Sequence, residues 1–240
     1  ASRVTTDGNR LAMHTPAASS NGPPQQPPAG WSWQVLATAA LALAERLESA
    51  GLRRGDRLVH SGPHAVEWVV TDLACLLAGI VHAPLHADMA AEQRRQWCEW
   101  LGAKAMLATG RDRQPLPAMP CPLLDWRTGS SDGLLPAGLP LPAEQLASQL
   151  AGRVAACDPD AEAVILFSSG TTGRGRAVVH SQRSLAANAA AAAAVFLEEP
   201  ADVRLAWLPL SHSLARTGDL GTALVRGACL AIVEDRLRVL

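Results

Sequence analysis

Apolar residues recur every three or four positions over residues 33–47, the spacing of an amphipathic helix, and Gly51 is placed to end it. The members of this face are Trp33, Leu36, Ala37, Ala40, Leu41, Ala44 and Leu47. The preceding residues lack periodicity and are rich in proline, serine and glycine. They predict loop or disorder over residues 1–30 and an ordered unit over residues 31–240.

Short apolar runs alternate with helical patterns along the rest of the chain. The predicted strands are 58–60, 80–83, 105–109, a short one near Leu123, 203–207 and 229–233. The predicted helices are 65–78, 88–101 with Asp88 as N-cap, 143–153, 184–197 with Ser184 as N-cap, and 214–226 stopped by Gly227. This alternation predicts an α/β fold of doubly wound, mostly parallel sheets with flanking helices.

Composition narrows the class of protein. The chain has 240 residues, 48% of them hydrophobic, and a formal net charge of −1, which argues against nucleic-acid binding and extensive disorder. Five cysteines without a Cys-x-x-Cys pair indicate reduced thiols in a cytoplasmic protein. Neither an apolar stretch of membrane-spanning length nor a signal-peptide pattern is found. The basic pair Arg53-Arg54 is compatible with a peripheral contact to anionic membranes.

The run FSSGTTGRGRAVVHSQRSL, residues 167–185, contains the strongest candidate chemistry. An apolar strand leads into a loop with four hydroxyl side chains and two glycines: Ser168, Ser169, Gly170, Thr171, Thr172 and Gly173. Hydroxyls and closely approaching backbone N–H groups bind phosphate oxygens. A plain surface turn is the alternative. The P-loop of nucleoside triphosphatases is excluded, because no lysine follows the loop and the next residues predict a strand.

This run resembles the phosphate-binding motif of the adenylate-forming (AMP-binding) superfamily, aromatic-Thr/Ser-Ser-Gly-Thr/Ser-Thr-Gly-x-Pro-Lys-Gly-Val. The first seven positions agree, whereas Gly175, Arg176 and Ala177 stand for the usual Pro, Lys and Gly. Residues 51–93 resemble the amino-terminal half of long-chain acyl-CoA synthetases, and WLPLSHSLART (residues 207–217) resembles the family's Pro-Leu-x-His motif with a following arginine. The resemblance is collinear from about Trp31 onward.

The resemblance implies a fold, a reaction and a site. The fold would be an incomplete amino-terminal domain of adenylate-forming enzymes. The reaction would join a carboxylic acid, expected to be a fatty acid, to coenzyme A through an acyl-adenylate, with ATP and Mg²⁺. Residues 168–173 and Arg176 would bind the ATP phosphates, and His212 would border the pocket for the substrate carboxylate and acyl chain. Arg216, one turn on, would support the loop or meet an anion.

Several family motifs are missing from this sequence. It contains no tyrosine, so the Tyr-Gly-x-Thr-Glu segment is absent, and its single lysine, Lys104, is not the carboxy-terminal catalytic lysine. We therefore expect a partial chain that is inactive alone, and the sequence identifies no catalytic residue. The alternatives are a fatty acyl-AMP ligase that delivers to a carrier protein, and a non-catalytic nucleotide-binding or interaction remnant.

Two histidine pairs, His60 with His64 and His82 with His86, have the four-residue spacing of a helical metal site. Proline interrupts each pair, at Pro63 and at Pro84, so neither lies on a continuous helix. The sequence therefore favours histidines in loops and at strand ends, without a metal.

Overall fold

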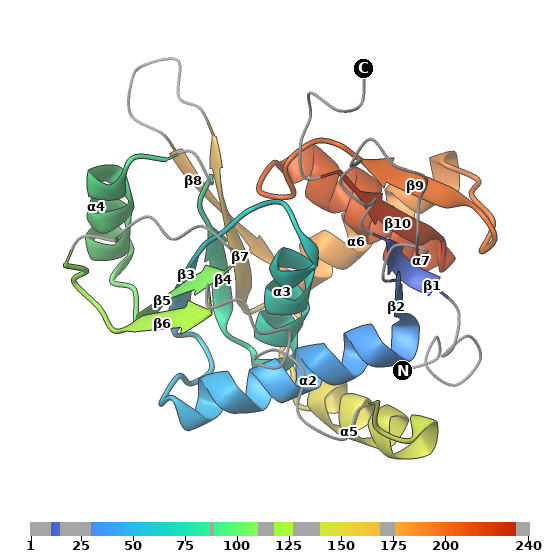
Figure 1. Cartoon of the computed structure of the whole chain (residues 1–240), viewed down its shortest axis with the longest axis horizontal. Helices are drawn as coiled ribbons and strands as arrows, with labels where there is room; N and C mark the ends of the chain where they lie inside the picture. Colours follow the sequence, from blue (N-terminus) through green and yellow to red (C-terminus); the bar gives the residue numbers. More distant parts are fainter. Residues whose placement is uncertain are drawn as a thin grey trace, which may run out of the picture.

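The computed structural model describes residues 11–14, 30–86, 89–109, 118–126, 140–168 and 176–233, which form two β-sheets with flanking helices (Figure 1). Strand order is β6-β5-β3-β4-β7-β8 in the larger sheet and β2-β1-β10-β9 in the smaller. The strands are β1 (Leu11–His14), β2 (Gly30–Ser32), β3 (Arg57–Ser61), β4 (Val81–Pro84), β5 (Ala105–Thr109), β6 (Leu123–Trp126), β7 (Glu162–Ser168), β8 (Arg176–Ser181), β9 (Val203–Ala206) and β10 (Cys229–Ile232). The helices are α2 (Trp33–Ser49), α3 (Val66–Ala78), α4 (Ala91–Leu101), α5 (Ala143–Ala155), α6 (Gln182–Val195), the π-helix η2 (Ala215–Gly221) and α7 (Thr222–Arg226).

Most neighbouring strands in both sheets run parallel, which confirms the predicted α/β class. Among the described strands, only the β1–β2 and β7–β8 pairs are antiparallel. Parallel neighbours require crossover connections, and helices supply them here, for example α3 between β3 and β4. The carboxyl ends of β3, β4 and β7 consequently lie at the same edge of the larger sheet.

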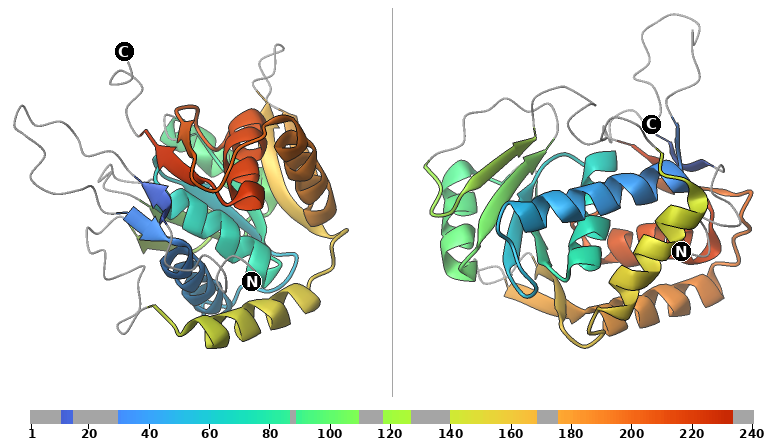
Figure 2. Two further views of the ribbon diagram at one scale, coloured as in Figure 1. Left: turned by 90° about the vertical axis from the view of Figure 1, so that its right-hand side faces the viewer. Right: turned by 90° about the horizontal axis from the view of Figure 1, so that it is seen from below.

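The inner strands β3, β4 and β5 of the larger sheet are buried on both faces, because their side chains alternate between two hydrophobic clusters. Leu58 and Leu107 belong to a cluster with α2 and α3, whereas Val59 and Met106 pack with α4. The first cluster also contains residues of β1, β10 and η2, so α2 and α3 join the two sheets into one core. Figure 2 shows α6 beside η2 and α7.

Three predictions about element boundaries are wrong. Leu11–His14 is a strand rather than loop, because its backbone pairs with β10 far along the chain, with Met13 opposite Leu230. Helix α4 begins at Ala91 with Ala90 in the N-cap position, so Asp88, which lies outside the described residues, is not its cap. Helix α6 begins at Gln182 because the Ser181 hydroxyl accepts a hydrogen bond from the Ser184 backbone N–H.

Three further observations concern membrane-spanning helices, the cysteines and the basic pair Arg53-Arg54. No helix in the described part of the chain is long and apolar enough to cross a membrane. The five cysteines are free thiols. The Arg53 guanidinium donates to the backbone oxygens of Glu48 and Leu52, so this side chain of the basic pair is engaged within the molecule.

Candidate active site

Strands β7 and β8 flank the predicted phosphate loop in the chain. Phe167 lies opposite Ala177 and Ser168 opposite Arg176, so the connecting residues 169–175 leave and re-enter the sheet at directly paired positions. Ser168 ends β7, and Arg176 begins β8 with an exposed side chain. The predicted residues Ser169, Gly170, Thr171, Thr172 and Gly173 lie outside the described residues.

The base of this hairpin is held by aromatic packing. The Phe167 ring lies 4.5 Å from the Trp97 ring of α4, measured between centroids, and Phe167 is buried in the cluster under that helix. Such aromatic pairs add about 0.5–1.5 kcal/mol to the effect of burial alone. The position from which the predicted phosphate loop departs is therefore fixed by the core.

Residues that follow β9 meet residues that follow β3 and β4. His64 Nε2 lies 2.9 Å from the Ala206 carbonyl oxygen, while its Nδ1 accepts a hydrogen bond of 3.4 Å from the Leu210 backbone N–H. His86 Nδ1 lies 2.9 Å from the Ser211 hydroxyl, and its ring is 4.7 Å from the ring of His212. The segment 207–212 thus sits at the carboxyl edge of the larger sheet, where open α/β sheets bind ligands.

His212, the predicted pocket residue, is exposed on this segment and contacts His86. Its backbone oxygen accepts a 3.0 Å hydrogen bond from the Arg216 N–H, which forms the first turn leading into η2. The structure therefore brings His212 to the same edge of the larger sheet as Ser168, the last described residue before the predicted phosphate loop.

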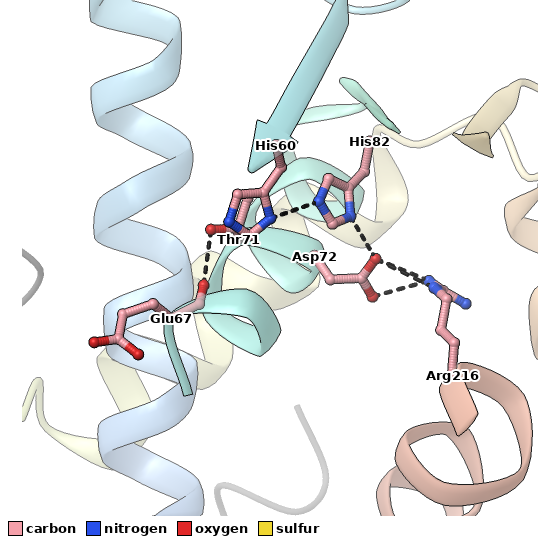
Figure 3. A network of polar contacts seen from close by, with 6 residues as sticks. All are labelled: His60, Glu67, Thr71, Asp72, His82 and Arg216. Carbon is pink, nitrogen blue, oxygen red and sulfur yellow. Dashed lines mark hydrogen bonds and ion pairs between the residues drawn. The ribbon is translucent and has the colours of Figure 1, made fainter. Parts of the chain in front are cut away.

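Behind this edge lies a buried chain of polar side chains (Figure 3). Arg216 donates to both carboxylate oxygens of Asp72, with Nη2 2.9 Å from Oδ2 and Nε 3.2 Å from Oδ1. His82 Nδ1 lies 2.8 Å from Asp72 Oδ1, and His82 Nε2 lies 3.1 Å from His60 Nδ1. His60 Nε2 lies 2.9 Å from Thr109 Oγ1, which completes a chain of five side chains.

Protonation of this chain follows from its geometry. Burial lowers the pKa of His60 well below its usual value, with the neighbouring His82 acting in the same direction, so His60 is neutral. Burial alone would raise the pKa of Asp72, but the charge of Arg216 and the hydrogen bond from His82 outweigh it and lower that pKa. The ionised carboxylate of Asp72 can only accept, so His82 donates to it from Nδ1, whereas donor and acceptor in the His82–His60 and His60–Thr109 contacts are set by the ring tautomers.

Sequence reasoning missed this chain. It considered each histidine with its neighbour four residues away, whereas the structure joins His60 to His82 across adjacent parallel strands. The available signal was Asp72, an acidic residue in an apolar helix, because a fully buried carboxylate requires a partner. The described residues contain no group of three or more His, Cys, Asp or Glu side chains placed to hold a metal.

A cavity of about 260 Å³ lies between α6 and η2–α7, next to the ion pair of Asp72 and Arg216. Gln182 and Thr217 complete its polar side. The rest of the lining is mainly apolar: Leu76, Leu185, Ala186, Ala189, Leu220, Gly221, Leu224 and Val225. Among the described residues predicted for the site, neither Arg176 nor His212 lines this cavity.

Known proteins resemble this chain in sequence. The family model described as AMP-binding enzyme matches residues 6–239. The chain is similar to the long-chain-fatty-acid–CoA ligase FadD15 of Mycobacterium bovis, with 30% identity over 78% of this chain and 33% of the relative. It is also 30% identical to the phenyloxazoline synthase MbtB of Mycobacterium sp. (strain MCS), over 72% of this chain and 13% of that protein.

Solved structures share the fold. ATP-bound MatB from Rhodopseudomonas palustris superimposes with a TM-score of 0.75 at 23% identity, covering 98% of this chain and 44% of that one. The amino-terminal subdomain of Klebsiella oxytoca NpsA, in complex with 3-hydroxybenzoyl-AMSN, gives a TM-score of 0.73 at 19% identity, covering 99% of this chain and 54% of the other. The chain thus spans one third or less of the curated relatives above, and about half of these solved chains.

Proposed function

The chain belongs to the AMP-binding enzyme family, and from that premise we propose that it carries the phosphate-binding part of an enzyme that activates a fatty acid with ATP. In the first half-reaction a carboxylate oxygen attacks the α-phosphorus of ATP, which forms an acyl-adenylate and releases pyrophosphate. In the second, the thiol of coenzyme A attacks the acyl carbonyl carbon and AMP leaves. The FadD15 relatives support the fatty acid and the thiol acceptor.

One observation carries this proposal. Ser168 at the end of β7 and Arg176 at the start of β8, the described residues on either side of the Ser/Thr/Gly loop, lie at the edge of the larger sheet where residues 207–212 meet His64 and His86. In the proposed site, residues 168–173 and Arg176 bind the β- and γ-phosphates, the leaving group of the first half-reaction, and His212 borders the carboxylate. Such chemistry depends on holding the reactants in place and neutralising charge on the phosphates.

Mg²⁺ would accompany ATP in this reaction. In nucleotide sites Mg²⁺ is held mainly by phosphate oxygens and one or two carboxylates. The described residues offer no group of three ligating side chains, and the carboxylate of Asp72 is already engaged by Arg216 and His82. We therefore name no described residue as a ligand of Mg²⁺ and derive no reaction step from the metal.

Thr172→Ala tests the phosphate-binding role. Loss of one hydroxyl from the leaving-group site should slow acyl-dependent exchange of pyrophosphate into ATP by roughly 10- to 100-fold, and binding of the acid should change little. The matched control is Ser148→Ala, which removes an exposed hydroxyl on α5. An unchanged rate of adenylate formation in Thr172→Ala would refute the assignment.

The exchange assay belongs on the native gene product, whose intact mass should first be compared with the 25.2 kDa of this chain. A product more than about twice as heavy, as the length of the relatives suggests, is the form in which we expect the full reaction. A product of the same mass that binds ATP without exchanging pyrophosphate would favour a non-catalytic remnant instead.

The peptide synthetase CymA of Salinispora arenicola and MbtB support a second candidate, transfer of the acyl group to a carrier protein. CymA is 28% identical over 65% of this chain, which spans 2% of that protein. Supplying the enzyme with coenzyme A in one reaction and a phosphopantetheinylated carrier protein in another separates the two acceptors. Thioester formation on the carrier alone would select the second candidate.

A further inference from the structure

The ion pair between Asp72 and Arg216 is buried to a degree that stability does not explain. The Asp72 side chain is 1% exposed and that of Arg216 is 7% exposed. Removing both charges from water costs about as much as their attraction returns, so apolar residues of similar size are often equally stable. We therefore ask which parts of the structure this ion pair holds in position.

Arg216 joins two structures at once. Its guanidinium binds Asp72 on α3, while its backbone N–H binds the oxygen of His212, the last residue of segment 207–212. It is also the second residue of η2, and π-helical turns are uncommon and frequent at functional sites. The orientation of this turn therefore depends on the side chain of Arg216.

A second ion pair holds the same π-helix from another side. Asp219 accepts a 3.0 Å hydrogen bond from Arg204 of β9, the strand that leads into segment 207–212. Burial raises the pKa of Asp219, and Arg204 acts against that shift. Asp219 thus ties η2 to its own sheet, whereas Asp72 adds an ion pair between η2 and α3, the helix packed on the larger sheet.

Asp72 is itself held in one orientation. Its Oδ1 accepts from His82, and the series of polar contacts continues through His60 to Thr109 in the larger sheet. Rotation of the carboxylate would leave the Nδ1–H of the buried His82 without its acceptor. The carboxylate therefore presents a fixed point to Arg216.

We propose that Asp72 is a positioning residue for the candidate active site. Asp72 holds Arg216 and thereby fixes the first turn of η2 and segment 207–212. This inference rests on the proposed function for the meaning of that segment, because His212 there borders the substrate carboxylate. Asp72 acts through Arg216 and touches no reactant. Its loss should disturb placement of the acid more than binding of ATP.

The main test is the double variant Asp72→Asn/Arg216→Gln. Asp72→Asn alone would leave a buried guanidinium without its partner and could unfold the chain, whereas the double variant removes both charges and keeps similar shapes. Arg216→Lys is the second variant, since it retains the charge and loses the two-point contact. The matched control is Asp160→Asn, which breaks an exposed two-point pair with Arg183 at the turn before β7.

The first measurement is amide hydrogen exchange of the chain without ligands. We expect exchange over residues 207–221 to become roughly tenfold faster in the double variant and less so in Arg216→Lys, with α4 and α5 unchanged. Asp160→Asn should leave residues 207–221 at the parent rate. The inference would be overturned if Arg216→Lys and the folded double variant both exchanged residues 207–221 at the rate of the parent protein. It would also be overturned if exchange became faster by the same factor in all helices and strands.

The second measurement compares two KM values, one for the carboxylic acid and one for ATP, in pyrophosphate exchange by the native gene product. The KM for the carboxylic acid should rise about fivefold or more and that for ATP should stay within about twofold. A purely structural role would lower the active fraction and leave both KM values unchanged, which would overturn the inference. Absence of exchange in the parent protein would refute the proposed function, while the hydrogen-exchange result would still decide whether Asp72 holds segment 207–221.

Discussion

Replacing Gly221 by alanine tests the contact that holds two candidate ligand-binding segments together. Helix α6 follows the β7–β8 hairpin and η2 follows segment 207–212, and the two helices touch at Gly221. A Cβ placed on Gly221 would lie 2.9 Å from the Cβ of Ala189 and 3.4 Å from the backbone oxygen of Arg216. None of these atoms can rotate away, so the helices must move apart.

Two effects of opposite sign set the magnitude. Overpacking a closely packed contact costs about 1–3 kcal/mol. Alanine is favoured over glycine inside a helix by about 1 kcal/mol, and the φ of −60° at Gly221 suits alanine. The free energy of unfolding should therefore fall by about 1 kcal/mol in Gly221→Ala.

Gly152→Ala is the matched control, because Gly152 lies within α5 and a Cβ there meets nothing within 4 Å. The same substitution should raise the free energy of unfolding by about 1 kcal/mol at this position. Urea unfolding of both variants gives the comparison, and Ala189→Gly should relieve the strain of Gly221→Ala. Equal stabilisation by the two alanine substitutions would refute the packing argument.

Two further predictions concern the buried polar chain. In Gly62→Ala the new Cβ would collide with Thr109 Oγ1 and displace that hydroxyl from His60. The free energy of unfolding should fall by about 1–3 kcal/mol, and a loss below about 0.5 kcal/mol in urea unfolding would contradict this. Because burial lowers the pKa of His60, the unfolded chain binds a proton that the folded chain does not, so stability should fall by about 1.4 kcal/mol from pH 7.5 to 5.5. The fall should be smaller in His60→Gln, and an equal fall in both proteins would show that His60 is not its source.

Local patterns predicted most of the secondary structure because most of the helices and strands have a clear hydrophobic period. The apolar face of α2 and the alternation of strands with helices were sufficient for the α/β class. The π-helical turn at Ala215–Gly221 was not predicted, because its hydrogen-bond pattern has no separate sequence signal and depends on contacts with α6 and Asp72. Strand β1 was missed for a similar reason, since its pairing partner lies near the other end of the chain.

The candidate site divides in the same way. The loop over residues 168–173 was found from sequence because its hydroxyls and glycines are contiguous, and its phosphate-binding role stays a prediction. Arg216 was expected either to support the loop or to meet an anion; the structure shows it bound to the carboxylate of Asp72. His60 and His82 were assigned to strand ends and loops, but both are fully buried strand residues in contact with each other.

The sequence by itself determined the family and the class of fold, because a contiguous motif and a regular alternation of apolar and polar positions are properties of neighbouring residues. Only the tertiary structure decided which polar groups meet. Asp72 and Arg216 are 144 positions apart, and His60 and His82 are 22 apart. Strand order and helix packing bring such partners into contact, and both arise only when the whole core forms. No local sequence pattern could therefore have identified these contacts.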